Sequence, residues 1–205
     1  MNLSELKQAL RAHSGTFLCV TRHGAGSEKS VPFRHEVMEP MGLDGVPDVG
    51  DLRSFYEVFG GIIFYLHEAS GDAARYIAPV NAWPGLHQDF SAWLEGLDQA
   101  EREEYLPDWV ATALVIGEEP HSGNYVLIPV AGDEAGGVYH FDHDGFEFSR
   151  HADSLTQYTR DLLDLDSRSL AYATTFMCFV EEGEQMQWHV KELRDNRGNH
   201  ISCEA

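Results

Sequence analysis

The chain has 205 residues, of which 43% are hydrophobic and 23% are charged, a composition typical of a globular protein with its own core and unlike that of a disordered chain. Its 34 acidic and 14 basic residues give a formal net charge of −20 at pH 7. Direct binding to nucleic acid is not expected, because phosphates require clustered Lys and Arg and the sequence has no basic run.

The N-terminal segment is predicted to form a short amphipathic helix. Leu3, Leu6 and Leu10 are spaced for one helical face, and Asn2 and Glu5 have the spacing of a capping box. A strand-like apolar run follows at 16–20, and stretches rich in Gly, Ser or Pro follow at 24–30 and 39–50.

A second helix is expected directly before two adjacent glycines. Its apolar positions fall at i, i+3, i+4 and i+7, and are Leu52, Phe55, Tyr56 and Phe59. Gly60-Gly61 is predicted to end this helix as a C-cap. A buried strand at 62–66 and a short extended piece at 75–80 are predicted next.

A third helix is predicted from Phe90, Trp93, Leu94 and Leu97, which share one helical face. The charged segment 98–105 could extend this helix or form a loop. Beyond it, short strands bounded by Gly, Pro, Asn or Asp predict an antiparallel meander at 111–116, 125–130, 137–142 and 145–149. Asp144-Gly145 is the hairpin turn between the last two of these strands.

The fourth helix is expected to begin at Ser154, which has capping-box spacing to Gln157. Its apolar stripe consists of Leu155, Tyr158, Leu162 and Leu165. Two further strands, 172–180 and 186–193, are predicted to form a hairpin through the loop 181–184. The predicted fold class is α+β, with a mainly antiparallel sheet and helices packed on one face or edge. The whole chain, 1–205, is predicted to be a single domain, with 170–205 as a C-terminal β-hairpin extension.

The cysteines and the apolar runs predict a soluble, cytoplasmic protein. Cys19, Cys178 and Cys203 are far apart and form no C-x-x-C pair, which favours reduced thiols over a disulfide framework or a zinc site. The N-terminus lacks a basic region followed by an apolar stretch, and the longest apolar run, at 62–66, is far shorter than the ~20 residues of a membrane span. No membrane association is therefore expected.

Histidines and carboxylates raise the question of metal binding at residues 140–145. Read as a calcium loop, this segment has His140 at the first position and His151 where a bidentate Glu should stand, so that reading is rejected. A zinc or iron site could use His140 and Asp142, which would project from the same side of a strand, but no third ligand is marked. A solvated hairpin tip is the favoured interpretation, and no metal or cofactor is expected.

No other group of residues requires catalysis. Cys19 could pair with His23 or His35, but it lies in an apolar strand-like run, where a free cysteine is usually a small core residue. The pair Gly24-x-Gly26 is too short for a phosphate-binding loop. The carboxylate pairs in turn-rich segments, Glu118-Glu119 and Asp133-Glu134, are explained at least as well by solvation.

The four tryptophans are predicted to have different surroundings. Trp93 lies on a helical apolar stripe and Trp188 on an alternating strand, which places both in the core. Trp83 and Trp109 stand beside or near prolines at segment ends, which favours a surface groove for these two.

The order of these signals resembles the SUKH superfamily, the Smi/Knr-type domain. The resemblance covers about 48–165. The runs that carry it are Asp51-Leu52-Arg53-Ser54-Phe55-Tyr56-Glu57-Val58-Phe59-Gly60-Gly61, Ile116-Gly117-Glu118, Gly123-Asn124-Tyr125-Val126-Leu127, Gly137-Val138-Tyr139-His140-Phe141-Asp142-His143-Asp144-Gly145 and Ala152-Asp153-Ser154-Leu155. Phe59 departs from the family, many of whose members have a small polar residue there.

The resemblance implies a non-enzymatic protein that binds and neutralises a cognate bacterial toxin, often a nuclease or deaminase. Residues 101–184 hold 18 acidic and 4 basic groups, a surface that could steer a basic partner, although solubility alone would also explain it. The candidate partner-binding residues are Glu118, Glu119, Asp133, Glu134, Asp142, Asp144 and Trp109. Two alternatives stay open: a metal-dependent enzyme that uses His140, Asp142 and His143, and a regulatory scaffold such as the eukaryotic members of the family.

Overall fold

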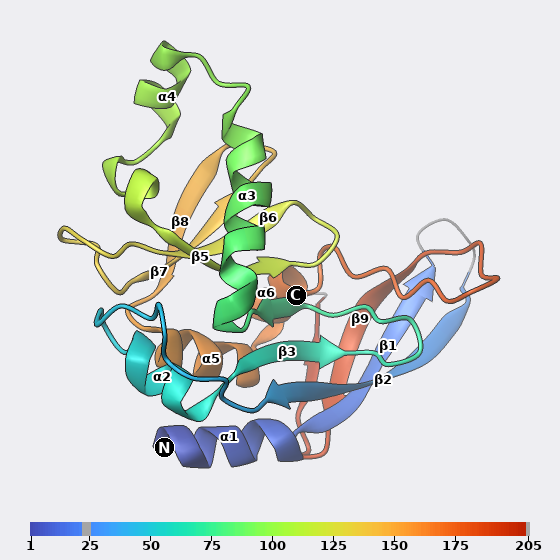
Figure 1. Cartoon of the computed structure of the whole chain (residues 1–205). Helices are drawn as coiled ribbons and strands as arrows, with labels where there is room; N and C mark the ends of the chain where they lie inside the picture. Colours follow the sequence, from blue (N-terminus) through green and yellow to red (C-terminus); the bar gives the residue numbers. More distant parts are fainter. Residues whose placement is uncertain (22–25, 204–205) are drawn as a thin grey trace. The chain divides into compact units, whose positions relative to one another are not determined.

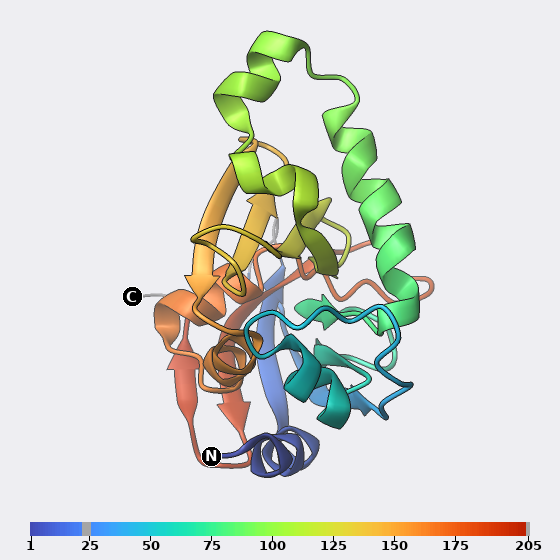
Figure 2. The ribbon, with the colours of Figure 1, turned by 60° about the vertical axis from the view of Figure 1, so that its left-hand side comes forward.

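Residues 1–21 and 26–203 are described by the structure, a computed structural model (Figures 1 and 2). The chain divides into two units. Unit 1 comprises Met1–Val37, Ile63–Arg75 and Asp161–Ala205, and unit 2 comprises Met38–Ile62 and Tyr76–Arg160. Both units combine helices with antiparallel strands, which confirms the α+β class. None of the helices in the described ranges has the length and apolar character of a membrane span.

Unit 1 is built on a sheet that joins the two ends of the chain. Its strands follow the order β10-β9-β1-β2-β3, and β1 pairs antiparallel with both β2 and β9. Phe17 of β1 thus lies opposite Val31 on one side and Leu193 on the other. The elements are α1 (Leu3–Ala12), β1 (Ser14–Thr21), β2 (Glu28–Met38), β3 (Gly61–Leu66), α6 (Ser167–Ala173), β9 (Trp188–Asp195) and β10 (His200–Ser202).

The N-terminal helix forms as predicted, because its local signals agree. The Asn2 side chain accepts a hydrogen bond from the backbone of Glu5, and the Glu5 side chain accepts one from the backbone of Asn2, which completes the capping box. Leu6 and Leu10 are fully buried. In Figure 1 this helix lies at the lower end of β1 and β2.

The C-terminal prediction is wrong at 172–180, which is not a strand. Helix α6 extends to Ala173, and the chain then runs without regular structure to Trp188. The carboxylate of the buried Asp72 accepts hydrogen bonds from the backbone N–H groups of Cys178 and Phe179, at 2.7 and 2.8 Å. A side chain therefore satisfies these two N–H groups, and they do not require hydrogen bonds from a neighbouring strand. The actual hairpin is β9–β10.

Unit 2 contains the predicted meander. Strands β4 to β8 are neighbours in chain order, and each consecutive pair is antiparallel. Helix α3 packs on β5, and α4 lies beyond the C-terminal end of α3 (Figure 1). The elements are α2 (Leu52–Val58), β4 (Arg75–Ile77), the 3-10 turn Val80–Ala82, α3 (Trp83–Leu94), α4 (Gln99–Tyr105), the 3-10 helix Asp108–Thr112, β5 (Leu114–Glu119), β6 (Asn124–Ile128), β7 (Val138–Asp142), β8 (Glu147–Ala152) and α5 (Leu155–Leu163).

The glycines after α2 have a different role from the predicted C-cap. Helix α2 ends as expected, but Gly60 does not adopt the left-handed conformation of a capping glycine. A Cβ atom at Gly60 would lie 1.9 Å from the carbonyl oxygen of Glu39, and the Gly60 N–H donates to the Met38 carbonyl. Close approach of two backbones therefore requires this glycine.

The third helix begins earlier than predicted, and of its predicted stripe only Phe90 is fully buried. It starts at Trp83 with Pro84 in its first turn, and its buried residues are Trp83, Leu86 and Phe90. Trp93, predicted to lie in the core, is 40% exposed. The charged segment after it neither continues the helix nor loops out. It forms the separate helix α4, whose start is fixed by a capping box between Asp98 and Glu101.

The closing helix α5 buries Leu155, Tyr158 and Leu162 of its predicted apolar stripe, and the fourth member, Leu165, is buried just beyond the end of the helix at Leu163. Its N-terminus has two acceptors. Ser154 Oγ accepts from the backbone of Gln157, and the Asp51 carboxylate accepts from the backbone N–H groups of Leu155 and Thr156, at 3.0 and 2.8 Å.

A chain of hydrogen bonds through two buried histidines crosses unit 1. The Tyr65 N–H donates to His35 Nδ1 (3.2 Å), so neutral His35 carries its proton on Nε2, which lies 2.8 Å from His13 Nδ1. His13 Nε2 then donates to Asp195 Oδ2 at 3.0 Å. Burial lowers the pKa of His35 to about 3 and also lowers the pKa of His13, despite the adjacent Asp195.

Because His13 and His35 are uncharged in this hydrogen-bond chain, we expect acid to lower the free energy of unfolding more in the wild type than in His35→Gln. Glutamine keeps an acceptor for the Tyr65 N–H and a donor for His13, but it does not titrate. Unfolded His35 takes up a proton below about pH 6.5, whereas folded His35 does not, so stability is lost as the pH falls. Between pH 7.5 and 5.5, urea denaturation should show the wild type losing about 1.4 kcal/mol more than the variant. Equal losses would contradict the assignment, and the exposed His87→Gln is the control.

Candidate functional site

The negative charge of the chain is concentrated in unit 2. This unit holds 20 Asp and Glu residues against 4 Arg and no Lys, a net charge of −16, whereas unit 1 holds 14 acidic and 10 basic residues, a net charge of −4. Unit 2 is therefore the source of most of the electrostatic field of the protein.

Three of the four arginines of unit 2 have local structural roles. Arg53 donates to the carbonyl of Val46, and Arg102 donates to the carbonyls of Leu94 and Leu97. Arg150, in contrast, bonds to carboxylates, those of Glu134 and Asp153, each at 2.9 Å. Arg53 and Arg102 are thus directed to backbone carbonyls, and Arg150 to carboxylates of the same unit.

The tip of the β7–β8 hairpin is positioned by a buried asparagine. Asn124 Nδ2 donates to Glu119 at 3.0 Å, and Asn124 Oδ1 accepts from the backbone N–H of His143 at 3.1 Å and from its Nδ1 at 2.8 Å. Glu119 is also buried, and its carboxylate orients the Asn124 side chain. Through this network Asp142 and Asp144 are held at the surface, where both are exposed.

The same tip contains the side chains that could hold a metal ion. One ligand atom from each of Asp142, His143 and Asp144 lies within 4.8 Å of the others. His140, the predicted third member with Asp142 and His143, is outside this group: its Nε2 lies 2.6 Å from the Tyr158 hydroxyl, and its ring stacks on His151. The group thus offers one imidazole and two exposed carboxylates, an arrangement that exposed acidic turns also produce without a metal.

Three other predicted residues meet at a second place on unit 2. Trp109, Asp133 and Glu134 line the same cavity, whose volume is 310 Å³. The Trp109 ring is half-buried and packs on Tyr139 at 4.5 Å between centroids. Glu134 accepts hydrogen bonds from Tyr139 and Arg150, and burial together with the Glu134 charge raises the pKa of Tyr139 to about 12. An aromatic ring is therefore fixed beside two carboxylates.

Glu118 has different surroundings from the other predicted acidic residues. It is half-buried on β5, and burial, followed by the charge of Asp89, raises the pKa of its carboxyl group. The charged form of Glu118 is therefore less favourable than that of a fully solvated glutamate.

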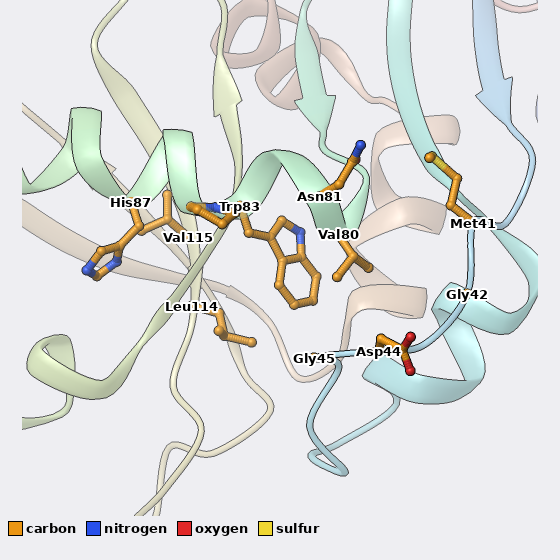
Figure 3. A pocket seen from close by; sticks show the side chains of 11 residues that line it. Met41, Gly42, Asp44, Gly45, Val80, Asn81, Trp83, His87, Leu114 and Val115 are labelled. Carbon is orange, nitrogen blue, oxygen red and sulfur yellow. The ribbon is translucent and has the colours of Figure 1, made fainter.

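A larger cavity of unit 2, of 620 Å³, was not predicted as a whole (Figure 3). Trp83 lies in its wall, as the prediction of a groove at this tryptophan suggested, but the indole is buried and only 6% exposed. The other walls come from the loop at 41–45, the start of α3 and the start of β5. Trp83 and the prolines and glycines in these segments were the sequence signals, but they did not indicate that the three segments meet, because the segments are far apart in the chain.

The remaining predicted residues have structural roles or lie outside the described ranges. Cys19 is fully buried, and burial raises the pKa of its thiol to about 12, so it is not a reactive thiolate. His35 bonds to His13, and His23 and Gly24 lie outside the described residues. Trp188 is buried, as predicted, whereas the exposed Trp93 packs on the His143 ring at 4.7 Å between centroids.

Comparisons with protein-family models, curated proteins and solved structures found no match to this chain. Its function is therefore inferred from the geometry and charge of its own residues.

Loss of the Asn124 side chain should loosen the hairpin tip. In Asn124→Ala the backbone N–H of His143 loses its acceptor and Glu119 loses a donor, so we expect the free energy of unfolding to fall by about 2 kcal/mol. Hydrogen exchange at the His143 amide should become about tenfold faster. The exposed Asp133→Ala is the control, and an unchanged exchange rate in Asn124→Ala would show that Asn124 does not position the tip.

Proposed function

We propose that this protein is a non-enzymatic immunity-type protein with a SUKH-like fold, which binds and neutralises a cognate toxin domain through the acidic surface of unit 2. The observation that carries the proposal is the net charge of −16 on unit 2. A toxin that grips nucleic acid is basic where it does so, and an acidic inhibitor can cover that surface while associating rapidly.

Two clusters support a binding role for this surface. Asp142 and Asp144 project from a tip that a buried network holds in place, so their charges are presented without a large ordering cost. Trp109 stands beside Asp133 and Glu134, and an aromatic ring among charges is typical of an interface anchor. Both features suit recognition of a basic protein.

The arrangement gives little support to an enzymatic role. The buried His140 is hydrogen-bonded to Tyr158, and the Cys19 thiol is held protonated by burial. Three widely spaced cysteines without a C-x-x-C pair, Cys19, Cys178 and Cys203, suit the cytoplasm, where we place the protein together with its toxin.

Capture from a lysate of its own organism tests the proposal. The tagged full chain is incubated with lysate and washed at low and then at moderate salt, and the bound proteins are identified by mass spectrometry. We expect one basic partner that contains a toxin domain. Expression of that partner alone should stop cell growth, and co-expression with this chain should restore it.

Growth that co-expression fails to restore would overturn the proposal. Capture of several regulatory proteins, none of them toxic, would favour the scaffold alternative and overturn it equally.

Charge reversal at the hairpin tip should slow association with the captured toxin. The double variant Asp142→Lys, Asp144→Lys is expected to lower the association rate constant about tenfold at low salt and to flatten its dependence on salt, because steering weakens. Stopped-flow measurements across a salt series check this.

The matched control changes the net charge equally on unit 1, with Glu28→Lys and Glu182→Lys. A control that slows association as much as the tip variant would show that net charge matters and that the tip itself does not.

A further inference from the structure

We infer that the 620 Å³ cavity at Trp83 is the anchor site of this interface, and that it takes an apolar side chain of the partner with an adjacent Lys or Arg next to Asp44. This inference rests on the proposed function and adds a contact chemistry to it. The cavity lies wholly within unit 2, the acidic unit.

The inner wall of the cavity is apolar. Trp83 and Val115 are buried, and Val80 and Leu114 are half-buried. Figure 3 shows the indole of Trp83 between Leu114 and Val80, with the loop of Asp44 opposite. An aliphatic or aromatic side chain inserted here would exchange water for apolar contacts on several sides.

The anchor wall is held in place before any partner binds. The Trp83 ring packs edge to face on Tyr56, with 5.1 Å between centroids. The Tyr56 hydroxyl donates to the Ala78 carbonyl at 2.8 Å, which fixes the orientation of the supporting ring. A wall that is already ordered loses little conformational entropy on binding.

The polar side chains around the cavity are available to a ligand. Asp44, Asn81 and His87 are exposed, and in the described part of the chain none of these side chains makes a hydrogen bond or an ion pair. The lining includes no Lys or Arg. Asp44 therefore gives the rim a negative charge, which favours a cationic group beside the apolar one.

Charge also selects the kind of occupant. A second copy of this chain would bring two acidic units together, which like-charge repulsion opposes, whereas a basic protein segment is complementary. Met41 stands at the rim with 70% exposure, and an exposed, flexible thioether adapts to a partner's surface. These observations favour a basic partner segment.

Peptide selection tests the ligand chemistry without knowledge of the toxin. The full chain is immobilised and panned with a phage-displayed random peptide library, and the enriched peptides are synthesised for calorimetry. We expect Leu, Ile, Phe or Trp next to Lys or Arg in the enriched sequences. Asp44→Lys should weaken their binding at least tenfold, and Met41→Ser about threefold.

Each variant has a matched control outside the cavity. Glu104→Lys makes the same charge change at an exposed position of unit 2, and Met186→Ser removes another exposed methionine, 52% accessible, from unit 1. Both controls should bind the peptides as the wild type does. Failure to enrich any peptide, or peptides that bind the cavity variants as well as the controls, would overturn the inference.

Two further measurements separate this inference from the proposed function. If Asp44→Lys and Met41→Ser release the captured toxin at the wild-type rate, the cavity is not the anchor, while the immunity function stands. The opposite result is also informative. If Asp44→Lys weakens binding of the enriched peptides but the capture experiment finds no toxin, the ligand chemistry is supported and the proposed immunity function is overturned. A dimer seen by sedimentation velocity and lost in Met41→Ser would show that a second copy fills the cavity, which would overturn the inference.

Discussion

Carboxylates that accept hydrogen bonds from the backbone hold distant parts of this chain together. Asp51 caps the start of α5 from 104 residues away, and Asp72 fixes the backbone at Cys178 and Phe179. Asp195 accepts from the backbone of the β9–β10 turn and from His13. An acidic protein has few cations for its buried carboxylates, and backbone N–H groups supply the needed donors without adding positive charge. The rest of each unit depends on these junctions.

This arrangement leaves the surplus charge outside, and most of it on unit 2. Self-repulsion among so many carboxylates lowers stability, and the basic partner that we propose would offset this repulsion. In the interface that we propose, the apolar cavity at Trp83 would supply what charge alone cannot, since long-range attraction speeds association but desolvated apolar contacts slow dissociation. The acidic surface and the apolar cavity would then have complementary roles.

Histidine is the residue type that most strongly suggests metal or catalytic chemistry, yet His13, His35 and His140 are used in buried hydrogen-bond networks. In the buried chain Tyr65 donates to His35, His35 to His13 and His13 to Asp195, and His140 is hydrogen-bonded to Tyr158. Each partner lies on another strand or helix, so neither arrangement follows from local sequence. Burial keeps the imidazoles of His13 and His35 uncharged, because a proton would have to be held away from water.

The sequence by itself determined the elements whose signals are local. The capping box of α1 and the apolar stripes of α2 and α5 each lie within about ten residues and formed as expected. The meander strands formed in the expected order, but β5 and β8 begin later in the chain than the predicted strands 111–116 and 145–149. Tertiary structure alone decided that 172–180 is irregular, that Gly60 serves a close approach and that Trp93 is exposed. It also decided which acidic residues face outward and which segments enclose the cavity. These outcomes depend on which backbone and side chains meet across large sequence separations, and periodicity carries no information about such meetings.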